Sequence, residues 1–125
     1  MKVYISTLVA VVLFCVAIVS CKKDELVYTR IMTMTTDISG GVVMFLGGAG
    51  KAFIDWGDGS PLQKKELSEL IVANNFFHEY QESKTRTIRI YGNDIVYLDC
   101  DQLQLTSLDI SRNIDLKELY CSYNQ

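Results

Sequence analysis

The stretch GKAFIDWGDGSPL, residues 50–62, is the part of the sequence that decides the fold class. Its first half alternates apolar and polar residues, so Ile54 and Trp56 would point to the same side of an extended strand. Gly57 and Gly59 follow at once, and glycine readily adopts the positive φ values that tight turns need. The stretch therefore predicts a β-strand that ends in a structured turn.

The aspartates of this turn allow two interpretations. Asp55, Asp58 and Ser60 are spaced closely around two glycines, and their oxygen atoms could serve as ligands of a calcium loop. However, the spacing lacks the density of a D-x-D-x-D-G loop, and no glutamate closes the loop at the right distance. We therefore expect Asp55 and Asp58 to accept hydrogen bonds from turn amides. No metal or cofactor is predicted.

Other segments before residue 93 also have the pattern of strands. They are LVYTRIMTMTT (26–36), GGVVMFLGG (40–48) and TRTIRIYGN (85–93). In the last of these, Ile88 and Ile90 are predicted to point inward and Thr87 and Arg89 outward. Residues 62–77 stay ambiguous, because Leu67, Leu70 and Ile71 have helical spacing. Short strands separated by turn signals predict an antiparallel sandwich over residues 26–93.

Three motifs in this region resemble the PKD-type immunoglobulin-like domain. They are FIDWGDGS (53–60), FHEY (77–80) and TRTIRIYG (85–92). The resemblance implies that His78 is a structural member of an H-x-Y motif and that Tyr80 is a buried corner tyrosine. His78 is the single histidine of the chain and has no partner motif for catalysis. We therefore predict no enzyme and no catalytic residues.

The last 32 residues contain an internal repeat. LDCDQLQ (98–104) and LYCSYNQ (119–125) align at an offset of 21 residues, and L-x-x-L-x-L patterns begin at positions 95, 105 and 116. Asn113 and Asn124 follow two of these patterns. The spacing resembles nested leucine-rich repeats built from two similar halves. It predicts incomplete repeats over residues 94–125, with the sandwich covering their first coil and further repeats beyond residue 125.

The repeat also predicts which side chains face solvent. By resemblance, the paired leucines point into the core, and the asparagines bind backbone groups where the chain turns. Cys100 and Cys121 would be equivalent core residues; free buried thiols are preferred, and a disulfide stays the alternative. The outward positions Asp99, Asp109 and Tyr120 are predicted to form a partner-binding face.

The N-terminus resembles that of bacterial lipoproteins. A short basic start and an apolar stretch predict a helical signal peptide over residues 1–20, and IVSC (18–21) resembles a lipobox. By that resemblance Cys21 carries the lipid, whereas bulky Phe14 makes Cys15 a poor rival. A spanning helix and an ordinary cleaved signal are the alternatives. KKDE (22–25) resembles a surface-export tag, and the other interpretation is a solvated tether.

Together these features predict a mainly β chain: a small PKD-like sandwich that caps a leucine-rich-repeat solenoid, behind a lipoprotein signal peptide. The formal net charge of −3 argues against a nucleic-acid partner. We expect an outer-membrane, surface-exposed protein that recognises a protein or glycan. The alternatives are a structural spacer and the non-catalytic N-terminal part of a secreted enzyme.

Overall fold

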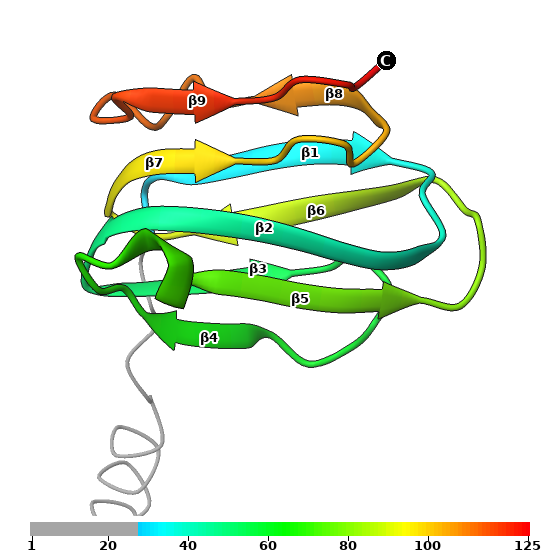
Figure 1. Ribbon diagram of the computed structural model, residues 1–125, viewed down its shortest axis with the longest axis horizontal. Coiled ribbons are helices and arrows are strands. Elements are labelled where there is room, and N and C mark those ends of the chain that lie inside the picture. The colour runs from blue at the N-terminus through cyan, green and yellow to red at the C-terminus, as the bar shows by residue number, and fades with distance from the viewer. Residues whose placement is uncertain (1–27) are drawn as a thin grey trace, which may run out of the picture.

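The computed structural model describes residues 28–125, which form nine strands in two stacked sheets (Figure 1). The predicted signal peptide, Cys21 and the tether lie outside the described residues. The strands are β1 (Ile31–Thr36), β2 (Gly40–Ala49), β3 (Lys51–Asp55), β4 (Gln63–Glu66), β5 (Asn75–Tyr80), β6 (Arg86–Tyr91), β7 (Asp94–Asp99), β8 (Leu105–Asp109) and β9 (Glu118–Tyr120). The prediction of a mainly β, sandwich-like chain is confirmed for this part of the sequence.

The first sheet has the order β4-β3-β6-β1-β8, and the second has the order β5-β2-β7-β9. All neighbouring strands are antiparallel except β7 and β9, which run parallel. Gly50, at a φ of 69°, makes the turn between β2 and β3, which belong to different sheets. Apart from β3 and β4, which pair in one sheet, consecutive strands alternate between the two sheets and enclose a shared core.

The core lies between the two sheets and follows the two-residue period of the strands. Ile54 and Trp56 are buried, as are Ile88 and Ile90 of β6. These four inward predictions are confirmed. Met32 and Met34 of β1 lie beside Ile90 and Ile88 in the same sheet, and Met44 of β2 enters the core from the other sheet. This flexible side chain suits an irregular gap between sheets.

The ambiguous segment 62–77 forms no α-helix. It contains β4, the short 3₁₀ turn η1 (Ile71–Ala73) and the start of β5. The Asn74 amide closes this loop, because its oxygen accepts from the Ser68 N–H at 2.9 Å and its nitrogen donates to the Ser68 carbonyl at 2.7 Å. Leu67 is buried while Leu70 is exposed, so the helical spacing does not correspond to one buried face.

The segment predicted as repeats extends both sheets. β7 pairs with β2 in the second sheet, and β8 pairs with β1 in the first. β8 and β9 are therefore the edge strands at one end of the sandwich, at the top of Figure 1. The described residues form no solenoid, and the division of the chain at residue 93 stays a prediction. Within the same residues, no helix is long and apolar enough to cross a membrane.

Candidate functional site

The turn after β3 is held by its two aspartates. The Asp55 carboxylate accepts a hydrogen bond from the Gly57 N–H at 2.9 Å, and the Asp58 Oδ1 accepts from the Ser60 N–H at 3.0 Å and its hydroxyl at 2.6 Å. Gly57 and Gly59 have φ values of 75° and 85°. These predicted turn roles are confirmed. An alanine at position 57 would be strained, because positive φ is unfavourable for any residue with a Cβ.

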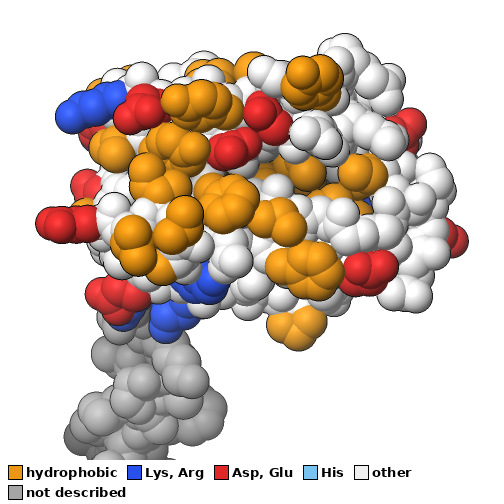
Figure 2. Space-filling model, viewed as in Figure 1, with side chains coloured by type: hydrophobic (Ala, Val, Ile, Leu, Met, Phe, Trp, Pro, Cys, Tyr) orange, Lys and Arg blue, Asp and Glu red, His pale blue; other side chains and the backbone are white. Residues whose placement is uncertain are grey.

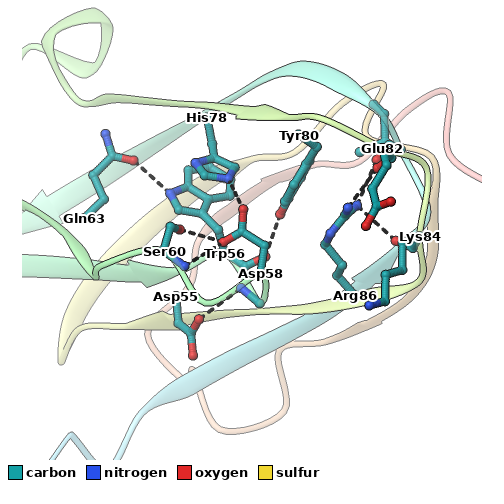
Figure 3. A network of polar contacts seen from close by, with 12 residues as sticks. Asp55, Trp56, Asp58, Ser60, Gln63, His78, Tyr80, Glu82, Lys84 and Arg86 are labelled. Atoms are coloured by element: carbon teal, nitrogen blue, oxygen red, sulfur yellow. Dashed lines mark hydrogen bonds and ion pairs between the residues drawn. The ribbon is translucent and has the colours of Figure 1, made fainter.

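His78 completes this turn from β5. Its ring stacks on Trp56 with centroids 4.8 Å apart, and its Nε2 lies 2.6 Å from the Asp58 Oδ2 (Figure 3). The Tyr80 hydroxyl donates to the Trp56 carbonyl oxygen at 2.7 Å. Each carboxylate oxygen of Asp58 thus has a partner within the protein. The arrangement ties a turn of one sheet to a strand of the other.

The same contacts set the pKa of Asp58. Desolvation raises this pKa, but hydrogen bonds from the Ser60 hydroxyl and N–H and from His78 outweigh it, so the pKa falls from 3.8 to about 2. One oxygen of the ionised carboxylate thus accepts hydrogen bonds from Ser60, and the other is bonded to His78 of β5. Among the described residues, no group of three His, Cys, Asp or Glu is placed to hold a metal ion.

A buried arginine beside this cluster was not predicted. Arg86 is only 7% exposed, and its guanidinium lies 4.3 Å over the Tyr80 ring. It donates to the carbonyl oxygens of Glu82 at 2.8 Å, Lys84 at 3.0 Å and Ile38 at 3.3 Å (Figure 3). The two-residue period carried the signal, because position 86 shares the inward face of positions 88 and 90.

Two of the three predicted partner-binding residues lie together on the outer face of the second sheet. Asp99 of β7 is directly opposite Tyr120 of β9 in the strand register, and the Tyr97 and Tyr120 rings are 5.5 Å apart. Tyr120 is 47% exposed. Phe45 of β2 lies on the other side of Asp99 in the same cross-strand row. Three neighbouring strands therefore each place an aromatic side chain on this face, around the Asp99 carboxylate.

This outer face is apolar and acidic. Figure 2 shows hydrophobic side chains across its middle with acidic side chains among them. Burial raises the pKa of the Tyr97 phenol, and the carboxylates of Asp99, Glu118 and Asp101 add to this effect. Beside Tyr97 lies an open depression of about 520 Å³ whose lining includes Glu118 and Ile71. The face thus presents aromatic surface next to hydrogen-bond acceptors.

Asp109 does not join this face. It ends β8 in the first sheet, where it pairs with Thr33 of β1. Its carboxylate accepts hydrogen bonds from the Ser111 N–H at 2.9 Å and hydroxyl at 2.6 Å, which lower its pKa. The repeat pattern grouped it with Asp99 because the two half-repeats look alike, but alternate halves enter different sheets. The structure therefore separates Asp109 from Asp99 and Tyr120.

The cysteines differ from each other in burial. Cys100 and Cys121 are both free. Cys100 is buried, and burial raises the pKa of its thiol to about 12, with a smaller contribution from Cys121. Cys121 is exposed, so the prediction that it is a core residue is wrong. The physical reason is that β9 has a neighbouring strand on one side only in the described part of the chain.

The two repeat asparagines also differ. The Asn124 side chain accepts from the N–H groups of Leu103 at 3.1 Å and Leu105 at 3.0 Å, and it donates to the carbonyl oxygens of Cys100 and Cys121. Its predicted role is confirmed. The side-chain amide of Asn113 is buried, and neither its nitrogen nor its oxygen makes a hydrogen bond with any described residue. The repeat position therefore predicted one asparagine correctly and not the other.

Comparisons with protein-family models, curated proteins and solved structures found no match to this chain. A proposal about function must therefore come from the chain's own residues. Two features stand out from the geometry described above. Both carboxylate oxygens of Asp58 are bonded within the fold, whereas Tyr120 on the outer face is exposed to solvent.

Proposed function

We propose that this chain is a lipid-anchored surface protein that binds a protein or glycan through the outer face of the β5-β2-β7-β9 sheet. The observation that carries this proposal is the contact between exposed Tyr120 and half-buried Tyr97, beside the carboxylates of Asp99 and Glu118. Tyrosine offers a large contact area at a low cost in side-chain entropy, since it has only two rotatable angles. Exposed apolar patches rimmed by polar groups are typical of interaction sites.

The surroundings of the pair favour a partner rather than a solvent-facing sheet. Val43 and Phe77 lie opposite each other on β2 and β5, and both are exposed on the same outer face. Four strands thus contribute apolar side chains to one surface. A strand-based surface is also rigid, so a partner would not have to order it on binding. The Asp99 and Glu118 carboxylates can accept hydrogen bonds from sugar hydroxyls or from basic side chains of a protein.

The proposed protein has a PKD-like sandwich, a leucine-rich-repeat segment and a lipid anchor on Cys21. The W-G-D-G turn with H-x-Y supports a PKD-like sandwich. The parallel pairing of Leu98 with Leu119, 21 residues apart, supports a leucine-rich-repeat origin for residues 94–125. The lipobox-like IVSC supports lipidation of Cys21 and a place on the outer membrane, where KKDE supports surface exposure. Stable anchoring would need two lipid signals or chains.

The test uses the full chain displayed on bacterial cells. The cells are applied to panels of immobilised extracellular proteins and polysaccharides, and retained cells are counted. Tyr120→Ser and Asp99→Asn should each reduce retention on the ligand that the unmodified chain binds. Tyr123→Ser is the matched control, because Tyr123 is exposed but follows β9 instead of lying within the sheet. Equal retention by all variants would contradict the proposal and favour the spacer.

A further inference from the structure

The outer face of the first sheet carries apolar side chains that the proposed partner-binding surface does not use. Phe53 of β3 and Tyr91 of β6 lie directly opposite each other in the strand register. Tyr28 packs beside both, with ring centroids 5.2 Å from Phe53 and 6.3 Å from Tyr91. Leu62 lies next to these rings and is 56% exposed. These four residues form a continuous group, called here the aromatic cluster.

The aromatic cluster faces away from the core. Ile54 and Ile90 pair with each other one residue further along the same strands and point inward, so Phe53 and Tyr91 take the opposite side of the sheet. The four side chains of the cluster line an open hollow of about 150 Å³. The only polar side-chain groups among them are the two tyrosine hydroxyls, so the hollow offers little to a sugar or a charged peptide.

Charged side chains with long stems border the aromatic cluster. The Lys64 ammonium lies 5.8 Å from the centroid of the Phe53 ring. The same face carries two further basic residues and two carboxylates, which are Lys51, Arg89, Asp55 and Glu66. Lysine and arginine can lay their stems along an apolar surface while their charged ends stay among water or lipid headgroups. The border is therefore compatible with a lipid surface against the cluster.

The aromatic cluster is close along the chain to the proposed lipid. Tyr28 follows Cys21 by seven residues. A chain of that length spans at most about 25 Å when fully extended. If Cys21 carries the lipid, the cluster is therefore held near the membrane, at an effective concentration on the order of millimolar. A contact too weak to bind a free protein to a membrane would then be populated.

We propose that the aromatic cluster rests on the lipid surface and orients the sandwich, with the outer face of the first sheet toward the membrane and that of the second sheet away from it. This inference rests on the proposed lipid anchor. Tyrosine suits the boundary between lipid and water, because its ring is apolar and its hydroxyl is polar. Exposed Leu62 enters the outer edge of the acyl chains. Tyr120, on the second sheet, is then presented to partners outside the membrane.

The test measures contact between the aromatic cluster and lipid in the full, lipidated chain. Leu62→Cys is combined with Cys121→Ser, so that the fluorophore NBD attaches at position 62 while buried Cys100 stays unlabelled. The protein is reconstituted into vesicles of phosphatidylethanolamine and phosphatidylglycerol, with and without spin-labelled acyl chains. NBD at position 62 should emit at a shorter wavelength and lose intensity when the spin label is present. Phe77→Cys is the matched control on the outer face of the second sheet, and NBD there should show neither change.

Intact mass spectrometry of the same samples separates the anchor from the orientation. Absence of the lipid mass on Cys21 would overturn both. A lipidated chain in which the spin label quenches positions 62 and 77 equally, or quenches neither, would overturn the orientation and leave the anchor standing. Short-wavelength emission at position 62 without quenching would also overturn it, because protein rather than lipid would then cover the cluster. Adding Tyr28→Ser should reduce the quenching at position 62 while the lipid mass stays, and unchanged quenching would contradict the role of the cluster.

Discussion

The Tyr80 hydroxyl donates a hydrogen bond of 2.7 Å to the carbonyl oxygen of Trp56 and thereby joins the two sheets of the sandwich. Tyr80 ends β5 in the second sheet, and Trp56 follows β3 in the first. Burial raises the pKa of Tyr80 to about 12, and the negative charge of Asp58 adds to this. The phenol is therefore protonated and a hydrogen-bond donor at neutral pH.

Tyr80→Phe should destabilise the sandwich while keeping its shape. The change removes one donor and leaves the buried Trp56 carbonyl without it, and an unsatisfied buried acceptor costs about 1–3 kcal/mol. Urea unfolding followed by tryptophan fluorescence would measure the free energy of unfolding, with Trp56 as the single reporter. Tyr123→Phe serves as the control, because Tyr123 is exposed. Equal stability of both variants would show that the inter-sheet bond contributes nothing.

The turn cluster predicts a loss of stability in acid. The pKa of Asp58 is about 2 in the folded chain and 3.8 in an unperturbed carboxyl, so folding favours the ionised form. The stabilisation is fully present above about pH 4 and is lost as the pH falls through 2. Melting temperatures measured from pH 5 to about pH 2 should fall more steeply for the unmodified chain than for Asp58→Asn. Parallel curves would contradict this.

Local features of the fold could be predicted from sequence. The positions of Gly57 and Asp58 are fixed by a turn of a few residues, and the inward direction of Ile88 follows from the two-residue period. Arg86 obeys the same period, but its charge argued against an inward position, since charged side chains are buried only when they are paired or hydrogen-bonded. Its carbonyl partners come from loops that a period does not specify.

Long-range pairing was the part that the sequence could not specify. The half-repeats around Leu98 and Leu108 look alike, yet one joins β2 and the other joins β1. Which sheet each half-repeat joins depends on whether β1 or β2 offers it a free edge. The positions of those edges are set by the assembled sandwich and not by the half-repeat itself. Asp109 therefore lies away from Tyr120, although the repeat placed the two at similar outward positions. For the same reason the exposure of Cys121 could not be read from its motif.

Arg86→Lys should cost stability although it keeps the charge. The guanidinium reaches three carbonyl oxygens and stacks on Tyr80 with one planar group, whereas an ammonium cannot match that geometry. We expect a loss of at least about 1–3 kcal/mol in the free energy of unfolding, because buried acceptors lose their donor. Arg89→Lys is the matched control on the outward side of β6. Equal effects of the two changes would contradict the prediction.

The anchor makes the last prediction, and it concerns residues outside the described part of the chain. If Cys21 carries the lipid, Cys21→Ser should remove the lipid mass and release the protein from the membrane fraction. Cys15→Ser should change neither, because bulky Phe14 precedes Cys15 whereas small Ser20 precedes Cys21. Intact mass spectrometry and fractionation of cells that produce each variant measure both properties. A Cys21→Ser protein that keeps the lipid mass and stays in the membrane fraction would contradict the lipoprotein proposal. It would not affect the description of residues 28–125.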